Sequence, residues 1–144
     1  MKYALATADN GPQIKQLLAA GELHHEDLDP HQLKHFMLAW EGSKPVGVVG
    51  LEIKQDCALL RSLAVDAAFR NRKIATRLVS EIEDYAKSLK VSTLFLLTMT
   101  AENFFAGCGY LKTDRESAPA GIQQTTEFQN LCPASAVCMV KHLT

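Results

Sequence analysis

Residues 63–75 read Leu-Ala-Val-Asp-Ala-Ala-Phe-Arg-Asn-Arg-Lys-Ile-Ala, and they join an apolar run to a helical pattern. The apolar run, residues 57–65, has the length and character of a buried strand. From about residue 72 to residue 89, apolar side chains recur at helical spacing along one face. They are Ile74, Leu78, Ile82, Tyr85 or Ala86, and Leu89. The stretch therefore predicts a strand, a short basic loop and a long helix in succession.

Further strands and helices are predicted on both sides of this stretch. Upstream we expect a strand at residues 3–7, a helix at 10–21 and a loop with a short helix at 22–32. Two strands then follow at 36–40 and 46–53, joined by a turn. Downstream we expect a strand at residues 93–98, a short helix at 101–106 and a strand at 110–113. A helix with a loop is expected at 117–133 and a last strand at 136–143. The long helix is the kind of connection that joins parallel strands, here 59–65 and 94–97. The sequence thus predicts a mixed α/β fold.

The composition is that of one globular domain, which we expect to span residues 1–144. Apolar residues make up 47% and charged residues 22%, which is enough material for a core. The 15 basic and 16 acidic residues give a net charge of −1, which argues against a nucleic-acid or membrane-surface binder. No segment has the pattern of a signal peptide or a membrane span, so we expect a cytoplasmic protein with reduced cysteines.

The start of the long helix is unusually basic, because Arg70, Arg72, Lys73 and Arg77 crowd there. The first turn of a helix has unpaired N–H groups and a partial positive charge, so cations are unfavourable at that end. A bound polyanion would reverse this cost, since N–H groups and cations would then converge on its phosphates. The alternative is a solvated charged face. Charge alone does not separate these two interpretations.

The same residues resemble the acetyl-CoA signature of the GNAT family of N-acetyltransferases. In that pattern a strand ending in L-x-V is followed by Arg or Gln-x-x-Gly-x-Gly or Ala at a helix start. Arg70 and Ala75 match, whereas Lys73 occupies the principal glycine position and Asn71 a frequent second one. The resemblance implies that acetyl-CoA is bound by Leu63, Ala64, Val65, Arg70, Asn71, Arg72, Lys73, Ile74, Ala75 and Phe105.

Residues 94–110 resemble the next signature of that family, a strand, a short helix and a glycine-aromatic ending. The resemblance implies a GNAT-like fold with a central mixed sheet, a splayed parallel strand pair and flanking helices. More narrowly, residues 60–65, 97–105 and 131–141 resemble small acetyltransferases encoded in arsenic-resistance operons, and 97–105 is also similar to N-acetylglutamate synthases. These resemblances imply acetyl transfer to the amine of a small, amino-acid-like molecule, with Thr98 contacting that substrate.

Two charged residues in the predicted strands are candidates for the chemistry. Glu52 lies in an otherwise apolar strand and is our candidate general base, because burial would favour proton uptake; alternatively it faces solvent. Arg61 interrupts an apolar run, where a charge is expected to be paired or functional. It would either bind a substrate carboxylate in fork geometry or form an ion pair with Glu52 or Asp56.

Other features leave the function open at specific points. Many relatives use a tyrosine in the short helix as general acid, but the chain has Phe105 there, so water or another group would serve. Lys73 and Phe105 favour an alternative function, an acyl-CoA sensor without turnover, and a protein or peptide acetyltransferase is a further alternative. The final strands could pair across a homodimer.

A histidine cluster and the cysteines suggest metal or thiol chemistry only weakly. His31 and His35, four residues apart, would share a helix face, but no known metal-ligand spacing completes the set, so we expect no metal. Cys138 lies in an apolar strand and is predicted to be a core residue, and Cys132 has no assigned role.

Overall fold

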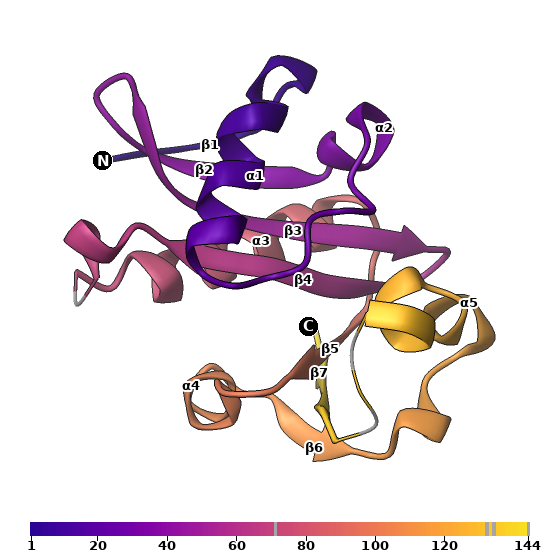
Figure 1. The fold of residues 1–144 in the computed structure, drawn as a ribbon. Helices are drawn as coiled ribbons and strands as arrows, with labels where there is room; N and C mark the ends of the chain where they lie inside the picture. The colour runs from indigo at the N-terminus through magenta and orange to yellow at the C-terminus, as the bar shows by residue number, and fades with distance from the viewer. Residues whose placement is uncertain (71, 132, 134, 144) are drawn as a thin grey trace. The chain divides into compact units, whose positions relative to one another are not determined.

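The structure is a computed structural model that describes residues 1–70, 72–131, 133 and 135–143. Its strands are β1 (Lys2–Leu5), β2 (Phe36–Glu41), β3 (Lys44–Lys54), β4 (Cys57–Val65), β5 (Thr93–Thr98), β6 (Leu111–Thr113) and β7 (Val137–His142). Its helices are α1 (Gly11–Ala20), α2 (Pro30–Leu33), α3 (Ile74–Ser88), α4 (Glu102–Gly107) and α5 (Ala120–Gln123) (Figure 1). The hydrogen-bonded strand order is β1-β2-β3-β4-β5-β7-β6, in which β4 and β5 are parallel. The mixed α/β fold with one parallel crossover is confirmed.

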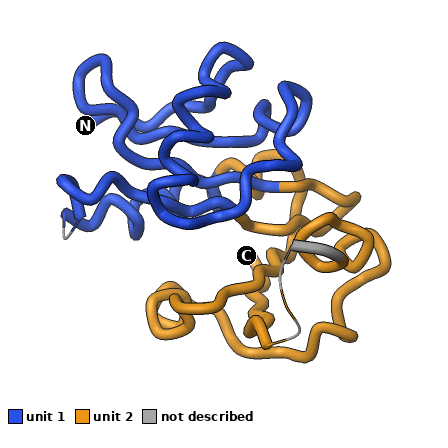
Figure 2. Tube along the Cα trace, in the orientation of Figure 1, with its two compact units in different colours: residues 1–51, 62–84 blue, residues 52–61, 85–144 orange. Residues whose placement is uncertain are grey.

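The chain divides into two compact units, each built from two separate stretches of sequence (Figure 2). Unit 1 contains Met1–Leu51 and Ser62–Asp84, and unit 2 contains Glu52–Arg61 and Tyr85–Thr144. Strands β3 and β4 and helix α3 each contribute residues to both units. Each unit is described below by itself.

In unit 1, α1 covers one face of an antiparallel set formed by β1, β2 and β3 (Figure 1). Ile14 and Leu18 of α1 are fully buried, because their spacing places them on one side of the helix. They belong to a core cluster with Ala6, Leu28, Leu33, Phe36, Leu38, Val48 and Ala64. Asn10 and Pro12 precede and open the helix, and Gly21 ends it, as the sequence predicts.

Two glycines of β3 leave room for large neighbours in unit 1. Gly50 is paired with Phe36 across the strands, and a Cβ on Gly50 would lie 2.3 Å from the phenyl ring. A Cβ on Gly47 would lie 2.9 Å from Leu78 of α3. Gly50 therefore leaves space for Phe36 of the neighbouring strand, and Gly47 leaves space for Leu78 of α3.

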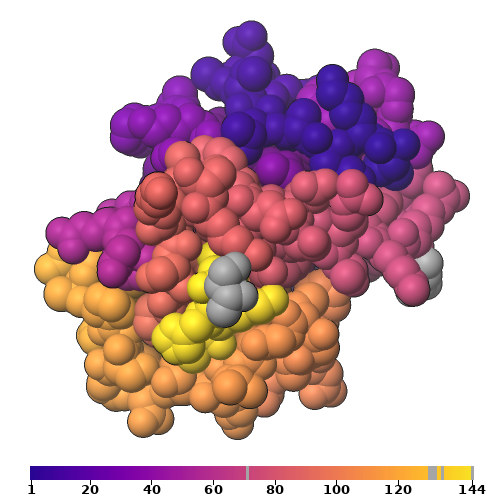
Figure 3. All heavy atoms as spheres, turned by 180° about the vertical axis from the view of Figure 1, so that it is seen from behind, coloured from indigo at the N-terminus to yellow at the C-terminus, as the bar shows by residue number. Residues whose placement is uncertain are grey.

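The part of α3 that belongs to unit 1 buries Ile74, Leu78 and Ile82, as its apolar spacing predicts. From behind, its pink atoms lie below the indigo atoms of the N-terminal segment (Figure 3). Arg77 joins the two, since its guanidinium lies 5.1 Å from the centre of the Tyr3 ring. Leu89 was expected on the apolar face, but α3 ends at Ser88 and Leu89 is 42% exposed.

Unit 2 is organised around β5, which pairs with β4 in parallel and with β7 in antiparallel register. The parallel register pairs Cys57–Leu59 with Thr93–Phe95. Strand β7 also pairs with β6, so it lies between β5 and β6. The core cluster of this unit contains Cys57, Leu59, Phe95, Ala118, Ile122, Phe128 and Cys138. Cys138 is thus a core residue, as predicted, and burial raises the pKa of its thiol to about 11.

Candidate active site

The loop between β4 and α3, in unit 1, has an unusual backbone at Lys73. Its φ is +59°, in the left-handed region, and its carbonyl accepts the N–H of Arg77, the first bond of the helix. Glycine adopts this φ freely, whereas a residue with a Cβ pays roughly 1–2 kcal/mol. The position where the resembling pattern has glycine therefore has a glycine-like conformation, which Lys73 adopts at a cost. Ile74 is buried at the start of α3, and Ala75 follows it half-buried.

Replacing Lys73 by Gly should therefore make the protein without ligand more stable, by about 0.5–1 kcal/mol after the flexibility of glycine is subtracted. Lys73→Ala is the matched control, because it removes the same charge but keeps a Cβ at positive φ. Chemical denaturation of the three proteins at one salt concentration measures the difference. Equal stability of the Gly and Ala variants would show that the backbone conformation is not the source of the effect.

Four cations surround this loop, and we call Lys44, Arg70, Arg72 and Lys73 the basic loop cluster. Arg72 lies over the Phe69 ring at 5.0 Å, and Lys44 Nζ lies 5.9 Å from the centre of the same ring. Lys44 also pairs with Asp66 at 3.6 Å, and Arg70 Nε donates to the carbonyl of Val65 at 3.3 Å. Asp66 in turn accepts the N–H of Ala68 and caps the short turn Ala67–Phe69. The cluster thus combines strong positive charge with a fixed backbone.

The cluster differs from the predicted one at two positions. Arg77 was expected to belong to it, but its guanidinium pairs with Glu81 at 2.9 Å and lies over Tyr3. Lys44 belongs to it although nothing in its local sequence indicates so, because it comes from the start of β3. The expected cofactor residue Asn71 lies outside the described residues.

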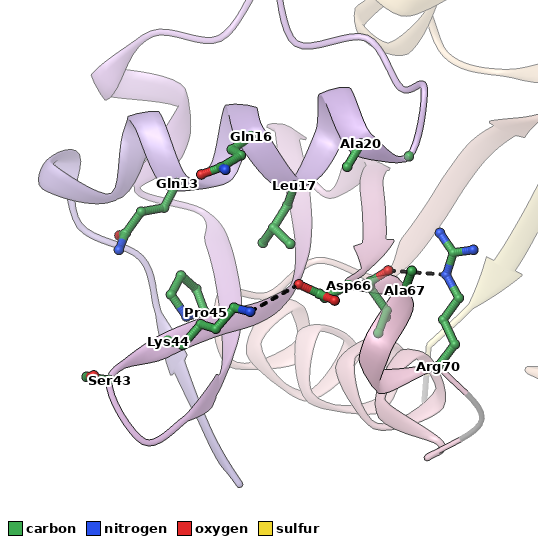
Figure 4. Close-up of a pocket in the computed structure, with 12 residues that line it drawn as sticks. Gln13, Gln16, Leu17, Ala20, Ser43, Lys44, Pro45, Asp66, Ala67 and Arg70 are labelled. Atoms are coloured by element: carbon green, nitrogen blue, oxygen red, sulfur yellow. Dashed lines mark hydrogen bonds and ion pairs between the residues drawn. The ribbon is translucent and has the colours of Figure 1, made fainter.

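A cavity of about 490 Å³ lies beside the loop, within unit 1 (Figure 4). Leu17 points into it from α1, between Gln13 and Ala20 of the same helix (Figure 4). The opposite wall combines the β2–β3 turn with the end of β4 and its loop: Ser43, Lys44, Pro45, Val65, Asp66, Ala67 and Arg70. Its size is in the range of small-molecule sites, and it is lined by apolar, amide and cationic groups.

The last part of β4 has a local distortion at Ser62, whose φ is +64°. A single left-handed residue in a strand is typical of a β-bulge, which turns the backbone that follows. Of the three residues predicted to bind the cofactor here, Ala64 belongs to the core of unit 1. Leu63 and Val65 are half-buried.

In unit 2, Glu52 and Arg61 form an ion pair at 2.6 Å, from Nη1 to Oε1. A second carboxylate, Glu127, pairs with the same guanidinium at Nε, 3.5 Å away. The Arg61 side chain has no exposed surface, and the two glutamate side chains are each 10% exposed. One of the two alternatives for Arg61, an ion pair with Glu52, is therefore observed, and Glu52 does not face solvent. Sequence reasoning missed Glu127, because it lies in the poorly patterned stretch 117–133.

Thr98 and Phe105, the other predicted site residues, also lie in unit 2. The Thr98 hydroxyl accepts the backbone N–H of Ala101, which precedes α4, so it shapes the turn between β5 and α4. Phe105 is buried in α4 and makes edge-to-face contacts with Phe104 at 5.2 Å and Tyr110 at 5.7 Å. Tyr110 is 1% exposed, so its ring serves the core.

The histidines do not form the expected pair on one helix face, because α2 ends at Leu33, before His35. Burial, followed by the charges of Lys34 and His31, lowers the pKa of His35. No three His, Cys, Asp or Glu side chains of the described residues are placed to hold a metal ion. Within the same part of the chain, no helix is long and apolar enough to cross a membrane. Cys132 lies outside the described residues.

The sequence model of the acetyltransferase (GNAT) family matches residues 5–110. This range includes the basic loop, helix α4, and Gly47 and Gly50 of β3. The chain belongs to the GNAT family. GNAT proteins are acetyltransferases. No curated protein sequence matches the chain.

Solved GNAT structures share its fold. An N-acetylglutamate synthase from Neisseria gonorrhoeae, complexed with coenzyme A and N-acetyl-glutamate, has a TM-score of 0.87 at 20% identity. It matches 99% of the chain, which spans only 35% of that protein. A Mycobacterium tuberculosis protein in complex with CoA and NLQ has a TM-score of 0.82 at 21% identity, over 100% of both chains. A GNAT acetyltransferase from Staphylococcus aureus has a TM-score of 0.77 at 16% identity, over 99% of both chains.

Proposed function

We propose that this GNAT chain transfers the acetyl group of acetyl-CoA to the amine of a small, amino-acid-like molecule. The observation that carries the proposal is the β4–α3 loop, in which Lys73 has a left-handed backbone beside three further cations. A polyphosphate is the ligand that such a loop favours, because cations and helix N–H groups both stabilise it. Arg70, Arg72, Lys73 and the N–H groups at Ile74 and Ala75 would hold the phosphates, and Lys44 would add a cation from the start of β3.

Acetyl-CoA supplies the acetyl group as a thioester. We propose that the main-chain N–H groups of Leu63 and Val65, after the distortion at Ser62, bind the thioester arm and its carbonyl oxygen. Fixed donors at a developing oxyanion are among the largest contributions an enzyme makes to a rate. Phe105 is the buried residue of α4 and is proposed to take part in binding acetyl-CoA, but its ring provides no hydroxyl at the position where many relatives have a tyrosine. Water is then the proton source for the leaving sulfur.

Glu52 is the proposed general base. An ammonium group must lose a proton before its nitrogen can attack the thioester carbon, and a buried carboxylate is suited to take it. The nitrogen then forms a bond to the acetyl carbon, the carbon–sulfur bond breaks, and the departing sulfur gains a proton from water. The ion pair with Arg61 fixes the orientation of the Glu52 carboxylate.

The amino-acid-like acceptor is supported by one solved neighbour, which is complexed with N-acetyl-glutamate. A carboxylate on the acceptor would interact with Arg61, the cation with which Glu52 and Glu127 both pair. Thr98 lies at the β5–α4 turn and is proposed to line the same acceptor site. The direct experiment measures release of free CoA from acetyl-CoA with a panel of amino acids and simple amines. The proposal fails if no acceptor in the panel raises the rate above hydrolysis.

Acetyl-CoA should raise the melting temperature, because a ligand that binds only the folded state stabilises it by about 2.7 kcal/mol at a hundredfold excess over Kd. The shift should become smaller as salt increases, since exposed phosphate contacts are screened. Thermal unfolding with CoA, acetyl-CoA and buffer alone measures both effects. An acyl-CoA sensor would give the same thermal shift without CoA release, and absence of any shift would contradict both functions.

A further inference from the structure

The proposed base of unit 2 has a feature that would weaken it. Glu52 lies 2.6 Å from the guanidinium of Arg61, and both side chains are buried. An adjacent positive charge stabilises the ionised carboxylate and makes it a poorer proton acceptor. A second negative charge on the same guanidinium would oppose this effect.

Glu127 provides that charge. Its Oε1 lies 3.5 Å from Arg61 Nε, while Glu52 is bonded to Nη1, so the two carboxylates occupy different edges of one guanidinium. We propose that Glu127 is a positioning residue for the acetyl-transfer reaction, which shares the charge of Arg61 and so keeps Glu52 an effective base. This inference rests on the proposed role of Glu52, and it assigns a function to the segment after α5.

The backbone around Glu127 is held in place by Arg115, which belongs to the same unit. Arg115 Nη2 donates to the carbonyl of Phe128 at 2.7 Å, and Nη1 donates to the carbonyl of Pro133 at 2.6 Å. The guanidinium also lies 5.4 Å from the centre of the Phe128 ring. Residues Glu127–Leu131 form a π-helical turn, a rare geometry that occurs often at functional sites. Arg115 thus fixes the turn from which Glu127 reaches Arg61.

The other charged groups on the elements that meet here are directed elsewhere or lie further along the chain. The stem of Lys54, on β3, packs against Gly121 of α5, where a Cβ would lie 3.1 Å from it. Asp56, in the turn between β3 and β4, is exposed, and so is Glu116 beside Arg115. Glu127 is therefore the buried carboxylate that pairs with Arg61 in addition to the proposed base.

Two variants of Glu127 test the inference. Glu127→Gln keeps a side-chain oxygen for Arg61 but removes the charge, so Glu52 becomes a weaker base. The acid limb of the pH profile of kcat/KM should move to lower pH by roughly one unit, the lower end of the effect of one nearby charge. The plateau rate should fall by up to about tenfold, since a weaker base accepts the proton less readily. Glu127→Asp keeps the charge and should leave the acid limb within about 0.3 unit of the original protein.

A second measurement does not depend on turnover. Carboxyl ¹³C NMR should show Glu52 titrating at lower pH in Glu127→Gln than in the original protein, with or without an acceptor present. An unchanged Glu52 titration in a folded Glu127→Gln protein would overturn the inference, even if stability fell. The proposed function fails separately, if no acceptor is acetylated. The proposed base also fails separately, if Glu52→Gln retains full activity although the Glu52 titration shifts in Glu127→Gln.

Discussion

Replacing Glu52 by Gln should lower kcat/KM for the acceptor amine by about 10²–10⁴, the usual contribution of a general base. Gln keeps the size of the side chain and an oxygen that can accept from Arg61, so the loss would come from the missing proton acceptor. The measurement is the initial rate of CoA release at saturating acetyl-CoA across a range of pH. The remaining activity should lose the acid limb that the original protein shows.

The control for this variant is the affinity for acetyl-CoA, measured by calorimetry, which should change by less than about twofold because Glu52 is proposed to act on the acceptor amine and not to hold the phosphates. A fall in both activity and acetyl-CoA affinity would indicate a structural role. Full activity in Glu52→Gln would contradict the assignment of Glu52 as the base. It would not contradict the proposed binding of acetyl-CoA.

Replacing Arg61 by Met should destabilise the protein by about 3–5 kcal/mol, because two largely buried carboxylates then lose their guanidinium partner. Chemical denaturation measures the loss. Arg77→Met is the matched control, since Arg77 pairs with Glu81 on the surface with its side chain 59% exposed. Such exposed pairs are worth about 0–1 kcal/mol. Equal losses in the two variants would contradict the buried ion-pair account.

Variants of Arg61 also distinguish its two proposed roles in catalysis, which are binding a substrate carboxylate and orienting Glu52. If it contacts a substrate carboxylate, Arg61→Met should weaken the use of carboxylate-bearing amines more than that of amines without a carboxylate. Arg61→Lys should recover little of this, because lysine lacks the fork that addresses two partners. Equal losses with both kinds of amine would indicate that Arg61 acts only by orienting Glu52.

The regular elements were predictable wherever apolar periodicity was strong. The strand at residues 93–98 has the predicted bounds, because it is a short buried run between polar residues. Helix α3 begins at Ile74 and not at residue 72, because the backbone of Lys73 is left-handed and so cannot be part of a right-handed helix. The loop with a short helix predicted at residues 22–32 is present, but its helix has only four residues, so His31 and His35 do not share a helix face.

The candidate site was predictable where its residues are contiguous and unpredictable where they are distant. The basic loop could be recognised because its cations follow one another at a strand–helix junction. Lys44 and Glu127 join their clusters through folding alone, and neither has a local pattern that indicates its partner. Lys73 shows a further limit. The sequence places it at the principal glycine position of the family pattern, but its positive φ, and with it the stability expected to be gained from glycine, is visible only in the structure.

The place of β7 between β5 and β6 has a consequence for synthesis on the ribosome. Both flanking strands are made first, and each then has an open edge with unpaired N–H and C=O groups. Leu111 of β6 is 72% exposed even in the folded protein, so the nascent edge there is also apolar. Until β7 is released from the exit tunnel, this half of the sheet is a target for chaperones and for mispairing between nascent chains.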